Sequence, residues 1–296
     1  MFRRRSIVFG FLFLFALLGV GCTATSESKE LKKLTIGVVS YGESKRSQEK
    51  FGGFKEYISA KTKSIVELEP TYNELRAIKQ IKDKRWDIVF APPGLAAIAI
   101  AKGGYKPLFP LEGVSNIQRS LIIVNQDSAI SQISDLANRT VALGQKGSAA
   151  GYYVPLYDLY GLTLKQIRFA PTPKKLLQWV AQGDVDAGAV SKQDFELHSR
   201  ELKKRNFKII HRGRYIPTGV VLISPDIAKD DLIKNAMKNA PGYITVDAGY
   251  VPNAKIPNYK QFIELVSKIQ PLEQNLRETP AVLTSSLSPD EEENSR

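Results

Sequence analysis

Short apolar runs alternate along this chain with stretches in which apolar residues recur every three or four positions. The short runs, rich in β-branched residues, are typical of buried strands, and the longer periodic stretches are typical of helices that face a core. The predicted strands are 34–39, 65–68, 86–91, 121–124, 140–143, 167–170, 185–190 and 219–224. The predicted helices are 72–84, 94–102, 149–160, 174–182 and 230–239.

Strand and helix in repeated alternation predict an α/β fold with parallel sheets. The strands are too many for one compact sheet, and extended polar joints occur near 112–118 and 212–217. Two α/β lobes joined by two crossover strands, which form a hinge, account for both features. We therefore expect lobe 1 to comprise 31–120 and 222–284, and lobe 2 to comprise 121–221. The polar residues 285–296 form a predicted flexible tail.

The N-terminus has the layout of an export signal. Arg3, Arg4 and Arg5 precede an apolar run over 7–20, and Cys22 follows directly after small residues. The run is shorter than the roughly 18 residues of a membrane-spanning helix. Residues 1–21 resemble a bacterial lipoprotein signal, in which Cys22 becomes the acylated first residue, palmitate among its chains, although Gly19 stands where such signals usually carry Leu.

An ordinary cleaved signal with an incidental cysteine is the alternative to lipidation. With lipidation, residues 22–30 are a tether, and the protein is expected on the periplasmic side of the bacterial cell membrane, held by its acyl chains.

Charge and cysteine content narrow the classes of partner. Cys22 is the only cysteine, so an intramolecular disulfide is impossible and stability depends on a core that 43% hydrophobic residues can supply. The net charge is +12, and +9 once the three signal arginines are removed. Because export disfavours nucleic acid, the positive field is left to attract anionic solutes or a membrane surface.

The most specific local signal is the segment 144–151, Gly-Gln-Lys-Gly-Ser-Ala-Ala-Gly, which follows a predicted strand and opens a helix. Small residues let an oxyanion approach the backbone, and the first helical turn offers N–H groups that have no partner within the helix. Ser148 fits as N-cap or as a hydroxyl donor, beside Ala149 and Ala150. A plain strand-to-helix turn capped by serine is the alternative. The segment is not a Walker A loop, because no Gly-Lys-Ser/Thr closes it.

Three further loops follow strands or begin helices and are candidates to wall a cleft. One contains Pro92, in the sequence Ala-Pro-Pro-Gly after the strand that ends at residue 91. Ser40 and Tyr41 follow the first strand, and Tyr72 begins a helix. Pro92 is also typical of an ordinary helix start. The Ser40–Tyr41 loop and Tyr72 can offer hydroxyl or aromatic groups to a small ligand, although a turn or core tyrosine is the better interpretation of either position taken alone.

An ordered set of motifs resembles the phosphonate/phosphate-type periplasmic solute-binding proteins of ABC importers. The set covers 34–224: Leu-Thr-Ile-Gly-Val-Val at 34–39, Trp-Asp-Ile-Val-Phe at 86–90, Ser-Leu-Ile-Ile-Val at 120–124, Ile-Ser-Asp-Leu at 133–136, the 148–151 loop followed by Pro155, Gly-Asp-Val-Asp-Ala-Gly-Ala at 183–189, and Ile216-Pro217. The resemblance implies a type II periplasmic binding protein fold. It also implies that two lobes close on a small oxyanion and deliver it to a membrane permease.

The chain departs from that family pattern at several ligand-facing places. The family loop typically reads Ser-Thr-Ser-Gly, so Ala149 and Ala150 lack two hydroxyls, each contributing on the order of 1.5–3 kcal/mol to a charged partner. Thr172-Pro173 stands where phosphonate binders carry Gly-His, and Gln118 stands where they carry tyrosine. Gly219 replaces the acidic residue that meets an aminoalkyl group, which disfavours 2-aminoethylphosphonate. Tyr72 matches a ligand-facing tyrosine.

Two cations and one carboxylate complete the candidate site. Arg119 or Lys174 can replace the missing hydroxyls with charge, unless both are surface cations. Asp186 can line the cleft or bond a backbone amide. The predicted ligand-binding residues are therefore Ser40, Tyr41, Tyr72, Pro92, Arg119, Ser120, Ser148, Ala149, Ala150, Thr172 and Asp186.

The sequence argues against an enzyme and against a resident cofactor. The two histidines, His198 and His211, form no close pair for a metal, and Lys146 occupies the place of the first glycine in a Gly-x-Ser-x-Gly elbow. We therefore expect a non-enzymatic lipoprotein that captures phosphate, phosphite or a simple phosphonate for an ABC permease. The alternatives are the same fold with a different small metabolite, and a ligand-sensing subunit that signals to a partner protein.

Overall fold

The computed structural model describes residues 32–39, 44–71, 73–112, 118–202 and 207–284. The signal, Cys22, the tether, Ser40, Tyr41, Tyr72 and the 285–296 tail lie outside the described residues. The described residues, from 32 to 284, all belong to one compact unit. In the described ranges, every helix is too short or too polar to cross a bilayer.

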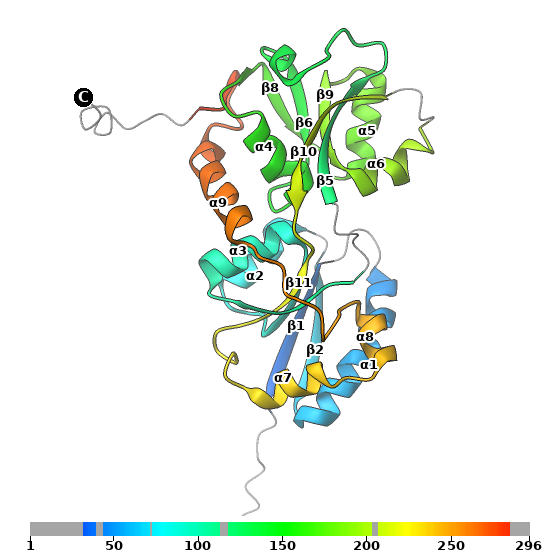
Figure 1. Cartoon of the computed structure of the whole chain (residues 1–296), viewed down its shortest axis with the longest axis vertical. Coiled ribbons are helices and arrows are strands. Elements are labelled where there is room, and N and C mark those ends of the chain that lie inside the picture. The colour runs from blue at the N-terminus through cyan, green and yellow to red at the C-terminus, as the bar shows by residue number, and fades with distance from the viewer. Residues whose placement is uncertain (1–31, 40–43, 72, 113–117, 203–206, 285–296) are drawn as a thin grey trace, which may run out of the picture. The chain divides into compact units, whose positions relative to one another are not determined.

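One sheet has the strand order β2-β1-β3-β11-β4. Its strands β1, β2 and β11 are labelled in Figure 1. β1 is parallel to β2 and β3, whereas β11 runs antiparallel to β3 and β4. The strands are β1 (Lys33–Val39), β2 (Ile65–Thr71), β3 (Ile88–Ala91), β4 (Lys106–Pro110) and β11 (Val220–Ile223). The helices around it are α1 (Ser44–Thr62), α2 (Glu74–Lys82), α3 (Pro93–Gly103), α7 (Asp231–Lys238) and α8 (Gly242–Ala248). We call this part lobe 1.

Alternation along β3 explains why helices cover both faces of this sheet. Ile88 and Phe90 belong to the core beneath α1, α7 and α8, whereas Val89 and Ala91 belong to the core beneath α2 and α3. Successive side chains of a strand point to opposite faces, so a strand that is apolar at every position must be covered twice.

A second sheet has the order β10-β5-β9-β6-β8. β6 is parallel to β8 and β9, and β5 is antiparallel to both β9 and β10. The strands are β5 (Gln118–Asn125), β6 (Thr140–Leu143), β8 (Gln166–Phe169), β9 (Ala187–Ser191) and β10 (Phe207–Ile216). Around it lie η1 (Ile133–Leu136), the π-helical turn η2 (Ala149–Tyr153), α4 (Val154–Asp158), α5 (Pro173–Gln182) and α6 (Lys192–Ser199). We call this part lobe 2.

The chain passes between the lobes from β4 to β5 and returns from β10 to β11. All eight predicted strands and all five predicted helices are present, within a few residues at their ends, and the two-lobe α/β fold class is confirmed. Two expectations need correction. The sheets are mixed and not purely parallel: β5 in lobe 2 and β11 in lobe 1, the strands that follow the two crossovers, run antiparallel to the other strands of their sheets. The predicted polar joint at 212–217 lies mostly in β10, which at this edge of the sheet carries exposed arginines and still pairs with β5.

The last part of the described chain, residues 259–283, contacts both lobes, and we call it the C-terminal arm. It holds α9 (Lys260–Ile269), η4 (Gln270–Gln274) and β12 (Ala281–Val282), and β12 pairs with β7 (Thr163–Leu164). α9 packs against α3 and α4 (Figure 1), and its buried side chains Phe262, Leu265, Val266 and Ile269 extend one core across both. The sequence interpretation placed 222–284 in lobe 1, whereas this arm pairs with a strand of lobe 2.

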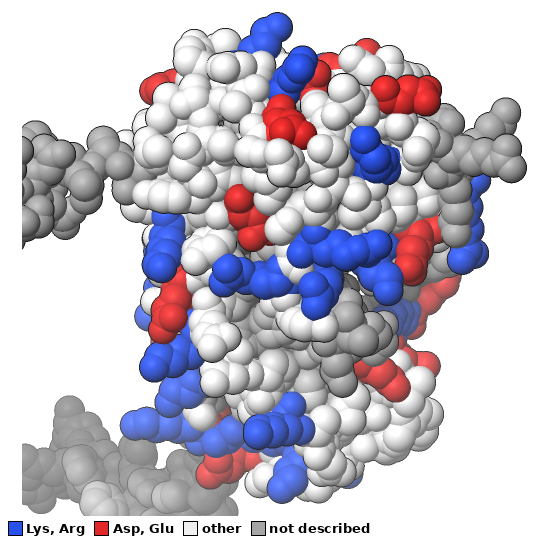
Figure 2. Space-filling model, turned by 45° about the horizontal axis from the view of Figure 1, so that its top comes forward, with Lys and Arg blue, Asp and Glu red and all other residues white. Residues whose placement is uncertain are grey.

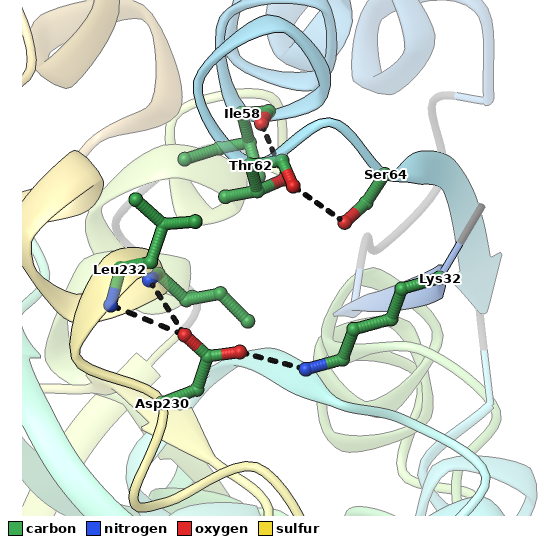
Figure 3. A network of polar contacts seen from close by, with 7 residues as sticks. Lys32, Ile58, Thr62, Ser64, Asp230 and Leu232 are labelled. Carbon is green, nitrogen blue, oxygen red and sulfur yellow. Dashed lines mark hydrogen bonds and ion pairs between the residues drawn. The ribbon is translucent and has the colours of Figure 1, made fainter. Parts of the chain in front are cut away.

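Polar contacts fix the start of the described chain to α7 (Figure 3). Asp230 caps α7 by accepting from the amides of Leu232 and Ile233, at 3.1 and 3.2 Å. Its second oxygen accepts from Lys32 Nζ at 2.7 Å. In the same view, Thr62 at the end of α1 donates to the carbonyl of Ile58 at 2.7 Å. The Asp230 bonds thus cap the start of α7 and tie it to Lys32, the residue before β1, whereas the Thr62 bond lies within the last turn of α1.

Gly37 is required in β1 because the indole ring of Trp86 lies against its backbone. A Cβ at Gly37 would lie 2.1 Å from a ring carbon of Trp86, which is fully buried and whose Nε1 donates to Glu69 at 2.7 Å. We expect Gly37→Ala to lower the free energy of unfolding by about 1–3 kcal/mol through overpacking. Urea unfolding measures this. Gly52→Ala is the control: no atom lies within 4 Å of the new Cβ in α1, so this change should stabilise by about 0.5–1 kcal/mol.

Candidate functional site

The loop 144–151, which follows β6, closes on itself before the helix begins. The Gly144 amide donates to the Gly151 carbonyl at 2.8 Å. Ser148 is the N-cap of η2, as predicted, and its Oγ accepts from the Gly151 amide at 3.0 Å. The Ser148 carbonyl accepts from the amides of Tyr152 and Tyr153 at 3.2 and 3.1 Å. The backbone of this loop is therefore fixed by its own hydrogen bonds.

A hydroxyl from the crossover strand completes the hydrogen bonding of this turn. In a π-helical turn each carbonyl accepts from the amide five residues later, as Ala149 does from Val154. For Ala150 the fifth residue is Pro155, which has no N–H. The buried Ser120 of β5 supplies the missing donor, with its Oγ 2.6 Å from the Ala150 carbonyl oxygen. Ser120, predicted to contact ligand, is placed here as a support for the loop.

Two glycines bring the backbones of lobe 1 and lobe 2 into direct contact at this loop. A Cβ at Gly94, in the first turn of α3, would lie 2.0 Å from the Gly147 carbonyl oxygen and 2.9 Å from the Ala149 amide nitrogen. Gly147 itself has φ +109°, and a Cβ there would lie 2.6 Å from Cβ of the buried Glu74 in α2. Pro92, the N-cap of α3, is two residues from this contact. The loop therefore lies between the helix starts of lobe 1 and the sheet of lobe 2.

A carboxylate of the C-terminal arm holds both flanks of the loop. Lys146 Nζ forms an ion pair with Glu273 Oε2, and Tyr152 donates from its hydroxyl to Glu273 Oε1 at 3.3 Å. Burial, and next the negative charge of Glu273, raise the pKa of the Tyr152 phenol, so this hydroxyl stays protonated and donates. The positive charge of Lys146 is thus compensated within the protein.

The other two cations that the sequence offered to this loop have partners elsewhere. The Arg119 guanidinium lies 3.8 Å from the ring centre of Tyr215, and its Nη1 donates to the Gly213 carbonyl at 3.3 Å. Lys174 pairs with Glu201 at 2.6 Å. In the structure both cations therefore have protein partners, and their replacement of the missing hydroxyls at a bound ligand stays a prediction. On β5, Arg119 and its neighbour Ser120 point to opposite faces of the sheet, and Ser120 faces the loop.

Asp186 and Thr172 both stabilise the start of a secondary-structure element. Asp186 accepts from the Thr140 amide at 2.8 Å, at the start of β6 and so at the opposite end of this strand from the loop. Asp87 in lobe 1 makes the equivalent bond to the Thr35 amide at 2.7 Å. Thr172 is exposed and caps α5 by accepting from the Lys175 amide at 3.2 Å. It follows β8, at the same edge of the sheet as the loop.

Sequence reasoning missed the two carboxylates nearest to the loop, Glu74 and Glu273. Glu74 opens a predicted helix, but only its burial against Gly147 distinguishes it from an ordinary first-turn acid. Glu273 lies 127 residues after Lys146, and no local pattern connects the two.

Away from the loop, the described part of the chain has a cavity and lacks a cluster of metal ligands. No cluster of three His, Cys, Asp or Glu that can hold a metal occurs in the part of the chain that the structure describes. A cavity of about 320 Å³ lies between α4, β10 and α9, with the lining residues Tyr157, Arg214, Gln261, Glu264, Leu265 and Lys268. Its lining is largely exposed and polar, and it does not include the loop, so the closed loop is the better candidate for the site.

The sequence model described as "ABC transporter, phosphonate, periplasmic substrate-binding protein" matches residues 36–241, which is more than half of the chain. The chain belongs to this family. It is thus a periplasmic substrate-binding protein of a phosphonate-type ABC transporter and not an enzyme. As in that family, it takes a small ligand and works with an ABC permease.

Solved structures of low sequence identity share the fold. A Xanthomonas citri protein bound to chloride has a TM-score of 0.67 at 20% identity, covering 80% of this chain and 97% of its own. A binding component of an ABC phosphonate transporter from Pseudomonas aeruginosa has a TM-score of 0.63 at 17% identity, covering 90% and 93%. PhnD1 of Prochlorococcus marinus, in complex with methylphosphonate, has 0.60 at 18%, covering 81% and 98%. A comparison with curated proteins gave no match.

The hydrogen bond from Ser120 to the Ala150 carbonyl is expected to contribute to the stability of the folded protein. Ser120→Ala leaves a buried carbonyl without a donor, so the free energy of unfolding should fall by about 1–3 kcal/mol. Denaturant unfolding measures the change. Ser267→Ala, on the exposed side of α9, is the control and should stay within about 0.5 kcal/mol of the parent. Equal stability of the two variants would show that the hydroxyl is not needed to hold the loop.

Proposed function

We propose that this substrate-binding protein captures a small tetrahedral oxyanion, namely phosphate, phosphite or a simple phosphonate, at the 144–151 loop. The observation that carries the proposal is the helical turn at Ala149 and Ala150, which begins where α3 of lobe 1 meets lobe 2. The first amides of such a turn have no acceptor inside it, so they are suited to an anion.

Backbone and hydroxyl donors would make most of the contact with the ligand. Ser148 accepts from the Gly151 amide with an oxygen lone pair, which leaves its hydroxyl hydrogen to donate. Three donors, the amides of Ala149 and Ala150 and the Ser148 hydroxyl, converge on one turn. Ser40, Tyr41 and Tyr72 of lobe 1 remain predicted ligand contacts, as does Pro92 beside the Gly94 contact.

Closure of the lobes would couple binding to delivery. The Gly94 backbone approaches Gly147 and Ala149 without any intervening side chain. A ligand that bonds to both lobes favours the form in which they meet, so binding shifts the open-to-closed equilibrium. A permease that recognises the closed form would then bind the loaded protein in preference to the empty protein.

Electrostatics favour a simple oxyanion over one that needs several charged contacts. Lys and Arg side chains gather in a band across one face of the molecule (Figure 2), and such a field raises the local concentration of anions. At the loop itself, Lys146 is paired with Glu273 and two family hydroxyls are replaced by alanine. The methylphosphonate in the Prochlorococcus marinus neighbour is a ligand of this simple kind.

A different small metabolite is the second candidate ligand. The observation in its favour is the same depletion of hydroxyls and of unpaired charge at the loop. With either ligand, we propose that acylation at Cys22 holds the protein at the membrane beside its permease.

Thermal melts and calorimetric titrations with methylphosphonate, phosphite and phosphate test the identity of the ligand. At 100 times its dissociation constant, a true ligand should stabilise the protein by about 2.7 kcal/mol in a thermal melt. No shift with any of the three would remove the oxyanion claim and leave the metabolite reading.

Ser148→Ala tests the loop. Loss of one hydrogen bond to a charged ligand should weaken binding by about 1.5–3 kcal/mol, or roughly tenfold to 150-fold. Ser267→Ala should bind as the parent does. Unchanged affinity in a folded Ser148→Ala protein would mean that the serine only caps the helix.

Cys22→Ser tests the anchor. Without the acylated residue the protein should move from the detergent phase to the aqueous phase in a phase-partitioning assay, since acyl chains supply the membrane affinity. Persistent detergent-phase partitioning of the variant would contradict lipidation at this position.

A further inference from the structure

Lys146 is the only cation in the 144–151 loop, and its charge is directed to the C-terminal arm. Its ammonium pairs with Glu273 of η4, with side-chain exposures of 38% for Lys146 and 16% for Glu273. The pair joins a loop of lobe 2 to a segment that is distant in sequence. A lysine without a partner would be free to turn toward an anion at the loop, whereas the ammonium of Lys146 is paired with Glu273.

Glu273 is carried by a well-anchored element. Leu272 and Leu276 on either side of it are buried, and β12 pairs with β7 a few residues later. At the start of the arm, the Tyr259 hydroxyl donates to the carbonyl of Thr218 in the β10–β11 crossover. The position of the carboxylate is therefore fixed by the fold of the arm, from the crossover to lobe 2.

The same carboxylate bonds to residues on both sides of the predicted anion donors. Lys146 precedes Ser148 by two positions, and Tyr152 follows Ala150 by two. One charge of Glu273 cancels one charge of Lys146 within this short segment, and Arg119 and Lys174 are engaged elsewhere. An oxyanion at the loop would therefore meet amides and a hydroxyl, with no net charge from the adjacent pair.

We propose that Glu273 is a positioning residue that sets the charge preference of the oxyanion loop by neutralising Lys146. This inference rests on the proposed function of the loop. Because the pair is neutral, it adds little to the dependence of anion affinity on ionic strength, and an additional negative charge on the ligand gains little from it. The residue acts through Lys146 and Tyr152 and does not itself contact the ligand.

The test uses two single variants that remove opposite charges from the one pair. Glu273→Gln keeps an oxygen that accepts from Lys146 or Tyr152, but it leaves the lysine charge uncompensated. Affinity for methylphosphonate at low salt should therefore rise, by about threefold to tenfold, and should fall steeply as salt is added. Lys146→Gln leaves the glutamate charge uncompensated, so affinity should fall by a similar factor and recover as salt screens the repulsion.

A purely structural ion pair predicts a different result. Loss of either partner would then loosen the loop, and both variants would bind more weakly without opposite responses to salt. The double variant Lys146→Gln/Glu273→Gln should return the salt dependence to that of the parent, because the segment is again neutral. Effects of the same sign in both single variants would overturn the inference.

Controls separate this outcome from general charge effects and from failure of the proposed function. Lys192→Gln and Glu196→Gln make the same charge changes in an exposed pair of α6, 3.8 Å apart, and each should alter affinity less than about twofold.

If the parent protein itself binds no oxyanion, the proposed function fails. If the parent binds and the two variants shift together, only the role of Glu273 fails. Should Glu273→Gln not fold, the salt response of Lys146→Gln decides: weaker binding that does not recover with salt overturns the inference.

Discussion

The structure of the loop depends on one buried hydrogen bond, from the Ser120 hydroxyl to the Ala150 carbonyl. Pro155 leaves that carbonyl without the donor that a π-helical turn would supply, and a carbonyl at a buried residue without a donor is costly. Ser120 lies near the start of β5, just after the chain has crossed from lobe 1. The bond therefore fastens the proposed ligand loop to a crossover strand.

The second constraint is the absence of side chains where the lobes meet. Gly94 and Gly147 bring backbone against backbone, and any Cβ at Gly94 would hold the lobes apart. The C-terminal arm adds a third connection, since it touches the crossover at Thr218 and the loop at Lys146. The loop is consequently positioned by contacts from lobe 1, lobe 2 and the arm. Such a position suits the proposed site, whose ligand would be bound when the two lobes close.

Local pattern was sufficient for most of the elements and for the position of the loop. Continuous β-branched runs indicated the buried strands, and the segment from Gly144 to Gly151 predicted a strand-to-helix turn after β6 and the Ser148 cap. The polar stretch near Arg212 was misjudged because an edge strand tolerates exposed charge on a backbone that still pairs. Arg119 was a reasonable anion ligand by type, and what the sequence pattern did not indicate is the register of β5 and β10, which places Tyr215 opposite Arg119 so that the guanidinium stacks on this ring.

By itself the sequence determined the α/β class, the two lobes and the turn after β6, because each follows from hydrophobic periodicity or from residues within one turn of each other. The tertiary structure alone decided which charges meet the loop. Lys146 and Glu273 are far apart in the chain, and their pairing exists only because the arm folds back along α3 and α4 to reach lobe 2. The electrostatics of the site therefore depend on distant contacts, which no local pattern encodes.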